Sequence, residues 1–392
     1  MMRQALSAGD AVALARELVA VDSRNPALSP DASGESAVAH LLAGILEDWG
    51  FRVEIQQAAP GRPNVIARIG TPGAPGAPGA RSIILNGHLD TVGVERMSHA
   101  PWDPEIRDGL LYGRGSADMK AGIAAMCAGA WRAAQPGLHG EVIIAAVADE
   151  EYRSIGTSAL LASGIRADAA IVTEPTRLAI CRAHKGFVWA DLEVRGIAAH
   201  GSRYDVGVDA IALAALVIAD LEAYQQRVLT TRAHPLLGRP SLHASLITGG
   251  QGISTYPDRC TVQLERRTIP GERPADFLRE LEESIARVRA GRPELSATVV
   301  PGFSQEPNDV PESDAVVRAL ASALQQHGVA PSIEGLYCWT DAALFTAAGI
   351  PAVCFGPGDI AVAHAATEFV PVREIEVAAD VIEQVLRDWF AA

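Results

Sequence analysis

Apolar strand-like runs that end in charged side chains constrain the fold of this 392-residue chain most strongly. Short, β-branched apolar runs occur at residues 51–55, 64–69, 82–85, 142–147, 169–172 and 352–355. Helical patterns lie between several of them, notably at residues 121–134. Apolar strands that alternate with helices indicate an α/β sheet covered on both faces. We therefore expect a central, mostly parallel sheet flanked by helices.

Histidines and acids follow these strands directly or lie in turns beside them. The set consists of His88, Asp90, Asp118, Glu150, Glu151, Glu174 and His364. Side chains just beyond the carboxyl ends of strands converge on one crevice of an open α/β sheet. Taken singly, each acid is more often a helix cap, but imidazoles and carboxylates together suit divalent metals such as zinc. The surplus of carboxylates favours two ions, ~3.5–4 Å apart, that share a bridging carboxylate.

The pattern changes near residue 185, where a second type of fold begins. Residues 187–196 and 260–269 read as half-exposed strands, and residues 208–224 and 275–289 read as helices. This β-α-β-β-α-β-like order indicates an inserted, ferredoxin-like α+β module. We expect the catalytic, metal-binding domain to comprise residues 1–184 and 299–392, interrupted by a module at residues 185–298.

Composition excludes several classes of partner. The chain has 33 Lys+Arg against 47 Asp+Glu, a formal net charge of −14, without a basic run that would suit nucleic acid. Its longest apolar run, residues 210–219, is shorter than the ~20 residues of a membrane span. The N-terminus has no signal-peptide pattern, and the five cysteines form no CxxC pair. We expect a cytoplasmic protein that binds neither nucleic acid nor membrane.

Seven motifs occur in order along the chain. They are HLDTV (88–92), GRGSADMK (113–120), DEE (149–151), EPT (174–176), GIAAHGS (196–202), RRTIPGE (266–272) and HAATE (364–368). Together they resemble the M20 metallopeptidase family, the group of acetylornithine deacetylase, succinyl-diaminopimelate desuccinylase, aminoacylase and glutamate carboxypeptidase. The resemblance covers essentially the whole chain. It is strongest to members of the acetylornithine deacetylase type.

The resemblance implies two divalent metal ions per subunit. Zn²⁺ is the expected ion, with Co²⁺ and Mn²⁺ as alternatives. One ion would be held by His88, Asp118 and Glu174, and the other by Asp118, Glu151 and His364. Asp118 would therefore bridge the two ions, and the resemblance further implies a cis peptide bond between Asp118 and Met119.

The resemblance also assigns roles to two acids that are not ligands. Glu150 would be the general base: it would take a proton from a water between the two ions and pass it to the leaving amine. Asp90 would accept the imidazole N–H of His88 and so fix its tautomer. Adjacent residues at a strand end point in different directions, so Glu151 can bind a metal while Glu150 stands over the water.

Two residues of the inserted module complete the implied site. His200 would come from the partner subunit of a homodimer and stabilise the tetrahedral oxyanion. Arg267 would bind the α-carboxylate of the substrate, whereas its neighbour Arg266 would point away along the strand. The alternative interpretation is that all three are solvated surface residues.

The chain departs from the family pattern at three places. Ser254 occupies a substrate-binding position where Asn is frequent, and Asp209 also replaces a common Asn. Residues 340–344 read TDAAL, without the arginine typical of desuccinylases. These departures weaken the desuccinylase interpretation and leave the acyl pocket undefined.

The implied activity is a metal-dependent amidohydrolase that removes an acyl group from an N-acyl-L-amino acid, as acetylornithine deacetylase does. Alternatives are a glutamate-carboxypeptidase-like enzyme acting on short peptides, a succinyl-diaminopimelate desuccinylase-like enzyme and a non-catalytic metal-binding homologue. Glu150 together with a full ligand set argues against the non-catalytic alternative. The sequence leaves open the acyl group, the amino acid and the physiological metal.

Overall fold

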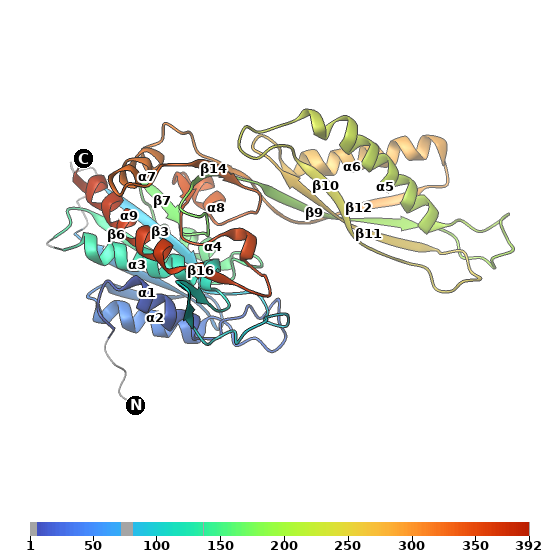
Figure 1. Cartoon of the computed structure of the whole chain (residues 1–392). Helices are drawn as coiled ribbons and strands as arrows, with labels where there is room; N and C mark the ends of the chain where they lie inside the picture. The colour runs from blue at the N-terminus through green and yellow to red at the C-terminus, as the bar shows by residue number, and fades with distance from the viewer. Residues whose placement is uncertain (1–5, 72–80, 136, 392) are drawn as a thin grey trace. The chain divides into compact units, whose positions relative to one another are not determined.

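The computed structural model describes residues 6–71, 81–135 and 137–391, which form two units that are treated separately (Figure 1). The larger unit contains the described residues up to Arg182, residues 310–334 and those from Thr340 onwards. The smaller unit contains residues 183–309 and 335–339. Among the described residues, no helix combines the length and apolarity that a membrane crossing requires.

A sheet with a parallel centre forms the larger unit. Its strand order is β1 (Arg52–Ala59), β2 (Arg62–Gly70), β6 (Glu141–Val147), β3 (Ser82–His88), β7 (Ala169–Val172), β15 (Ala352–Cys354) and β8 (Ile180–His184), with β14 (Ile333–Leu336) paired to β8. The sheet path ends in β13 (Asn308–Asp309), whose two residues are counted in the smaller unit. Strand β3 runs parallel to β6 and β7, and β15 runs parallel to β7. The first two strands form an antiparallel edge. This arrangement confirms the predicted fold class.

Helices cover both faces of this sheet. One layer contains α1 (Ala11–Val19), α2 (Ser36–Asp48), α3 (Ala121–Ala133), α7 (Ala315–Gln326) and α9 (Val372–Ala391). Helices α4 (Ile155–Ala162) and α8 (Ala342–Ala347) contact the strands from the other side. Because strand side chains alternate, Ile83 and Leu85 of β3 pack into the first layer while Ile84 between them points to the other face.

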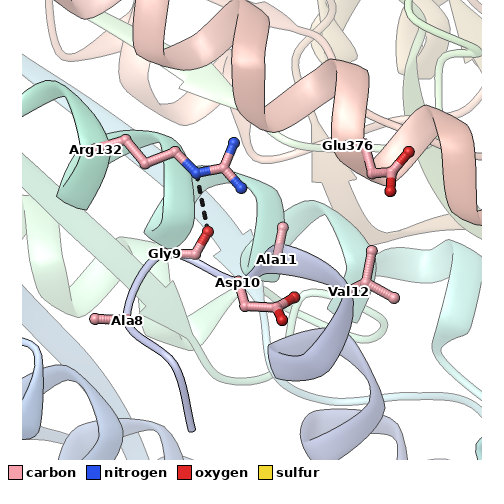
Figure 2. A pocket seen from close by; sticks show the side chains of 7 residues that line it. All are labelled: Ala8, Gly9, Asp10, Ala11, Val12, Arg132 and Glu376. Atoms are coloured by element: carbon pink, nitrogen blue, oxygen red, sulfur yellow. Dashed lines mark hydrogen bonds between the residues drawn. The ribbon is translucent and has the colours of Figure 1, made fainter.

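The start of α1 is fixed by two local contacts, and Figure 2 shows the one between Arg132 and Gly9. The Asp10 carboxylate caps the helix by accepting from the Ala13 N–H at 2.9 Å, as its place before the apolar pattern predicts. Arg132 of α3 donates through Nε to the Gly9 carbonyl at 2.9 Å. The hollow beside these residues has a volume of about 310 Å³, and none of the predicted site residues lines it.

The smaller unit is an antiparallel sheet with helices on one face. Its strand order is β10 (Ser241–Gly249), β11 (Arg259–Thr268), β9 (Gly186–Arg195) and β12 (Ser296–Gln305). Helices α5 (Ala210–Arg227) and α6 (Pro274–Gly291) pack with Leu192 of β9 and Val262 of β11 in one core. A short 3₁₀ turn, η2 (Leu229–Thr231), follows α5.

The smaller unit extends further along the chain than the expected module at residues 185–298. Strand β12 pairs antiparallel with β9, so the unit ends at Asp309. Pro301 and Gly302 look like a strand break in the sequence, but they lie at an irregularity in the register of an edge strand, where proline is tolerated.

Short elements of the larger unit hold the loops near the strand ends. Strands β16 (Phe369–Pro371), β5 (Leu110–Tyr112) and β4 (Ile106–Arg107) form a small antiparallel sheet. The π-helical turn η1 (Ser116–Lys120) leads into α3, and the 3₁₀ turn η3 (Ile360–Val362) precedes His364. The peptide bond between Asp118 and Met119 is cis, as the resemblance implied.

Candidate metal centre

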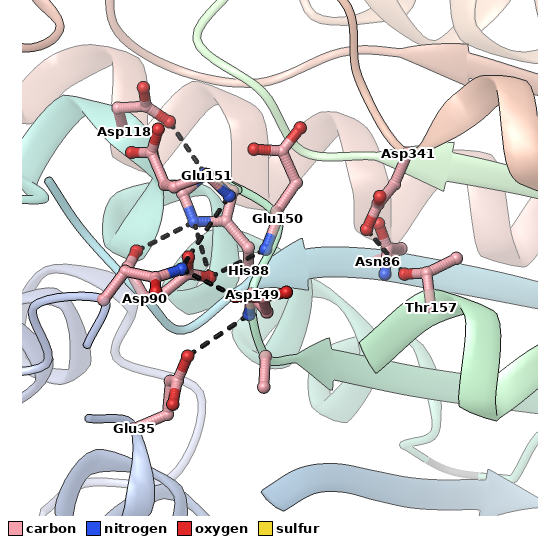
Figure 3. A network of polar contacts seen from close by, with 12 residues as sticks. Glu35, Asn86, His88, Asp90, Asp118, Asp149, Glu150, Glu151, Thr157 and Asp341 are labelled. Atoms are coloured by element: carbon pink, nitrogen blue, oxygen red, sulfur yellow. Dashed lines mark hydrogen bonds and ion pairs between the residues drawn. The ribbon is translucent and has the colours of Figure 1, made fainter. Parts of the chain in front are cut away.

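The predicted ligands of the larger unit meet at the carboxyl ends of the parallel strands, and Figure 3 shows His88, Asp118 and Glu151 among them. His88 is the last residue of β3, while Glu150 and Glu151 follow β6 and Glu174 follows β7. Asp118 lies in η1 and His364 follows η3. Parallel strands end at the same edge of a sheet, so residues far apart in sequence come together there.

Asp118 lies between the two histidines. Its Oδ1 atom lies 2.9 Å from Nε2 of His88, and its Oδ2 atom lies 3.3 Å from Nε2 of His364. The same Nε2 atom of His364 lies 3.1 Å from Oε1 of Glu151. Each Asp118 oxygen therefore faces a different imidazole, the orientation that a bridging carboxylate requires.

Two overlapping groups of atoms have the spacing of metal ligands. Ligand atoms of His88, Glu150 and Glu174 lie within 4.8 Å of one another, and so do those of His88, Asp118 and Glu151. His88, Asp118 and Glu174 are almost fully buried. The structure therefore brings together six of the seven residues singled out in the sequence, with the seventh, Asp90, directly behind them. It also places the predicted general base, Glu150, against His88 and Glu174.

Electrostatics within this group favour binding of cations. Burial and the charge of Glu174 raise the pKa of Glu150 well above its usual range. Burial and the charge of Asp118 raise the pKa values of both Glu151 and Glu174. These shifts mean that ionised carboxylates are disfavoured here until positive charge is supplied. Two imidazoles with several oxygen donors fit divalent ions of the zinc type, which supply that charge.

His364 responds to the same acids in the opposite direction. Hydrogen bonds to Asp118 and Glu151 raise the pKa of His364 to about 10. For Asp118, burial alone would raise the pKa, but hydrogen bonds from His364 and His88 outweigh it and lower the pKa. The protonated imidazoles thus partly offset the negative charge of the carboxylates. When a metal ion binds, the imidazoles would be neutral ligands and the ion would supply the positive charge instead.

Asp90 contacts His88 differently from the expectation. Nδ1 of His88 lies 2.9 Å from the main-chain oxygen of Asp90 and 3.7 Å from its carboxylate, which is too long for a hydrogen bond. The imidazole N–H therefore donates to the backbone carbonyl. The Asp90 carboxylate instead accepts from the N–H groups of Glu150 at 3.1 Å and Glu151 at 3.2 Å. Asp90 thus fixes the turn that carries both glutamates.

A buried network behind Asp90 was not predicted from the sequence. Asn25 donates through Nδ2 to Asp90 at 2.8 Å and to Asp149 at 2.9 Å. Arg62 donates to Asp149 at 2.9 Å and pairs with the buried Glu35. None of these residues follows an apolar strand in a distinctive motif, apart from Asp149 in the DEE run. Only the fold brings them together.

Asp341 is a further acid that the sequence interpretation set aside within TDAAL. It is buried at the start of α8, and Thr157 donates to its Oδ2 atom at 2.5 Å. Burial raises the pKa of Asp341 to about 6, and its charge contributes to raising the pKa of Glu150. Asp341 follows a short loop and does not directly follow a strand, so the positions of the strand ends did not predict it as a site residue.

His200 and Ser254 lie together in paired loops of the smaller unit. His200 forms an isolated β-bridge with Thr255, and the Gly201 N–H donates to the Ser254 carbonyl at 2.7 Å. Nδ1 of His200 lies 2.9 Å from the Ser202 hydroxyl, and both His200 and Ser254 are exposed. Asp209 accepts from the Ala212 N–H at 2.9 Å and caps α5, which explains why Asp can replace Asn there.

Arg266 and Arg267 point to opposite faces of the small sheet. Arg266 is buried and paired with Glu272. The side chain of Arg267 is 35% exposed, pairs with Glu265 at 2.9 Å and lies 5.5 Å from the centre of the Phe187 ring. Of the two, Arg267 is accessible to a ligand. It lines a hollow of about 600 Å³ on the sheet face away from the helices.

Comparison with protein families identifies the group to which this constellation belongs. Residues 84–388 match the model of peptidase family M20/M25/M40. The chain belongs to the M20 family. It is 30% identical to acetylornithine deacetylase from Proteus mirabilis (strain HI4320), over 97% of each chain. It is 34% identical to acetylornithine deacetylase from Myxococcus xanthus, over 84% of this chain and 86% of the relative.

Solved structures share the fold of this chain. Aminopeptidase PepT from Bacillus cereus ATCC 10987 has a TM-score of 0.80 and 22% identity, covering 97% of this chain and 98% of its own. The Bacillus subtilis YXEP protein is a dinuclear metal-binding peptidase from the M20 family. It has a TM-score of 0.71 and 15% identity, covering 97% of this chain and 98% of its own. The chain is thus an M20 metal-dependent hydrolase of amide bonds.

Proposed function

We propose that this M20 hydrolase removes a small acyl group from an N-acyl-L-amino acid of the acetylornithine kind. The observation that carries the proposal is the cluster of His88, Glu150 and Glu174 beside the bridging-type carboxylate of Asp118. The two deacetylases described above are similar to this chain over most of its length. Their named activity is therefore the first to test.

The roles of the cluster follow the two groups of donors. We propose that two divalent ions, with Zn²⁺ expected, are bound by His88, Asp118, Glu151, Glu174 and His364, and that Asp118 contacts both. When bound, the ions supply Lewis-acid polarisation of the scissile carbonyl and a lowered pKa of the attacking water. Glu150 takes a proton from that water and delivers it to the leaving amine. Asp90 keeps Glu150 in place through its backbone N–H.

The smaller unit supplies the groups that hold the substrate in this proposal. Arg267 binds the α-carboxylate of the amino acid, because its guanidinium is the accessible one of the pair. His200 stabilises the developing oxyanion, and Ser254 in the adjoining loop contacts the substrate. Both loop residues are exposed, as groups that reach a partner's site must be.

A homodimer is part of the proposal. Edge strand β10 exposes Leu246 and Ile247, and α5 exposes Ile211 and Leu216. An exposed apolar edge strand is a template for pairing with another chain. No disulfide joins the five cysteines in the described part of the chain, and four of them are buried, which supports a cytoplasmic location.

A panel of acylated substrates tests the proposed activity. Zinc-loaded protein is assayed with N-acetyl, N-formyl and N-succinyl amino acids and with N-acylated dipeptides, and release of the free amine is measured. We expect the highest kcat/KM for N-acetyl or N-formyl amino acids. Preference for the dipeptides would replace the proposal with the carboxypeptidase alternative. Preference for N-succinyl substrates would favour the desuccinylase alternative.

Subunit mixing tests whether His200 serves the partner's site. His200→Ala and Glu150→Ala proteins are each inactive in the proposal, but a mixed dimer contains one site with both residues intact. Random re-association should restore roughly a quarter of wild-type activity, because half of the dimers are mixed and each has one intact site. No recovery, with mixed dimers demonstrated by mass spectrometry, would show that His200 does not act across subunits.

A further inference from the structure

We propose that the buried ion pair of Arg114 and Glu368 positions Asp118 by tying together the three loops that carry His88, Asp118 and His364. The inference rests on the proposed metal centre. It concerns residues that lie outside the ligand set. Both side chains are buried, Arg114 at 3% exposure and Glu368 at 0%.

Glu368 uses both carboxylate oxygens to hold the loop that contains Asp118. Its Oε1 atom accepts from the N–H groups of Ala117 at 3.0 Å and Asp118 at 3.1 Å. Its Oε2 atom accepts from the Gly115 N–H at 3.1 Å and from Nη1 of Arg114 at 2.6 Å. All four contacts need an acceptor, and only an ionised carboxylate offers two oxygens with no donor.

Arg114 connects this loop to the two other ligand loops. Its Nε atom donates to the Gly93 carbonyl at 3.0 Å, in the segment that begins with His88 and Asp90. Its Nη2 atom lies 3.4 Å from the Ala365 carbonyl, next to His364. One guanidinium therefore contacts the loops after β3 and after η3 and, through Glu368, the turn that contains Asp118.

The local backbone conformation explains why the loop needs these hydrogen bonds with Arg114 and Glu368. Residues 113–119 have irregular conformations, with φ of 145° at Gly113 and 80° at Gly115, so ordinary helix bonds do not satisfy their N–H groups. A Cβ atom at Gly115 would lie 2.8 Å from the Thr91 side chain, which leaves little room for the loop to move. Glu368 supplies the acceptors, and the Asp118 carboxylate is thereby held between His88 and His364.

The inference predicts a specific loss of metal affinity. Groups that orient metal ligands usually contribute about 10–100-fold to affinity. In Glu368→Gln, the amide NH₂ must face either the Arg114 and Gly115 donors or the Ala117 and Asp118 donors. Because donors would then oppose donors, the loop has to shift, and Asp118 moves with it. Since Asp118 contacts both ions in the proposed centre, both should bind more weakly.

Competition with a chromophoric chelator measures the affinity of the full-length protein for Zn²⁺ alone. We expect Glu368→Gln to bind zinc about 10–100-fold more weakly than wild type. Arg114→Met should lose less zinc affinity than Glu368→Gln, because Glu368 still accepts hydrogen bonds from three backbone N–H groups. The matched control is Glu280→Gln, a buried ion-paired glutamate of the smaller unit. It should lower the urea midpoint without changing zinc affinity.

Each outcome decides the inference. Wild-type zinc affinity in folded Glu368→Gln would overturn it, and so would an equal loss of affinity in Glu280→Gln. If Glu368→Gln does not fold by circular dichroism, Arg114→Met decides, and unchanged affinity in that variant would overturn the tie. Because the measurement uses no substrate, a wrong acyl-group assignment leaves it unaffected. A wild-type protein that binds no zinc would instead refute the proposed metal centre.

Discussion

The metal centre of the larger unit and the ion-paired group around Arg266 in the smaller unit bury charged groups in opposite ways. In the larger unit, carboxylates of Glu150, Glu151 and Glu174 face one another and Asp118, and their pKa values are raised. In the smaller unit, charges of opposite sign alternate. Arg232 lies 2.8 Å from Glu272 and 3.2 Å from Glu280, and the buried Arg266 contacts the same two acids. Paired charges stabilise a fold, whereas a group of one sign lowers stability until a ligand neutralises it.

This contrast separates function from structure within one chain. Titratable groups whose pKa values are shifted by burial and by like charges cluster at functional sites. In the smaller unit, Nη2 of Arg266 donates to Glu272 and Nη1 of Arg232 donates to Glu280, so cations and acids face one another as in a structural ion pair. Four predictions test this contrast.

Removing the metal should have the largest effect. Extended dialysis against a chelator should abolish hydrolysis, and added Zn²⁺ should restore it. Hydrogen exchange should become faster in η1 and in the turn after β6, because repulsion between the carboxylates returns. Exchange in β9 and β11 should stay unchanged. Equal acceleration in both units would contradict the contrast.

Replacing the general base should separate rate from stability. Glu150→Gln should lower kcat by at least ~10²-fold, the scale of general-base catalysis, while the protein still binds zinc. Because Glu150 lies among like charges, the variant's metal-free form should be no less stable than wild type in urea unfolding. A clear loss of stability would show that Glu150 supports the fold. Unchanged kcat would refute its catalytic role.

Removing Arg266 from the ion-paired group should lower stability and leave the metal centre unaffected. Arg266→Met leaves Glu272 and Glu280 buried with one cation fewer, and removing one partner of a buried ion pair costs about 3–5 kcal/mol. Urea unfolding measures this loss, and chelator competition should show unchanged zinc affinity. A stable Arg266→Met protein with weakened zinc binding would invert the comparison.

The smallest effect concerns a buried histidine of the smaller unit. Among the described residues His184 has no acid partner, its Nδ1 atom contacts the Lys185 carbonyl, and burial lowers its pKa to about 4. Below its usual pKa of 6.5, the imidazole of the unfolded chain binds a proton that the folded protein does not. The contribution of His184 to stability therefore falls as pH decreases from 6.5 to 4, by about 2 kcal/mol at pH 5.

His184→Gln supplies the control for that measurement. Its unfolding free energy should change less between pH 7 and pH 5 than that of wild type, because the unfolded chain has one fewer group to protonate. Urea unfolding at the two pH values measures the difference. Identical slopes in the two proteins would show that His184 is not neutral in the folded state.

The sequence predicts elements well where apolar residues form continuous runs. Helix α3 and strands β3, β6 and β7 begin and end close to the predicted residues, because apolar runs mark them. Strand β10 was missed because nearly all of its residues are exposed, so its side chains show no alternation. Strand β12 was missed because Pro301 and Gly302 interrupt its pattern.

The same reasoning explains what the sequence could locate in the site. His88, Glu150 and Glu174 follow buried strands, so fold topology alone brings them to one edge. Asn25, Arg62 and Asp341 reach the cluster from loops and neighbouring elements. Their contribution depends on side-chain contacts that periodicity does not encode.

Strand β15 has a consequence for synthesis on the ribosome. It pairs with β7 and β8 in the interior of the large sheet, although it comes from residues 352–354 of 392. The first half of the larger unit must therefore wait, with that part of its sheet incomplete, until residue 354 has been translated. The smaller unit comprises residues 183–309 and the five residues 335–339, and its long continuous part can form first. His364 emerges later still, so the complete ligand set assembles only after both units have largely been translated.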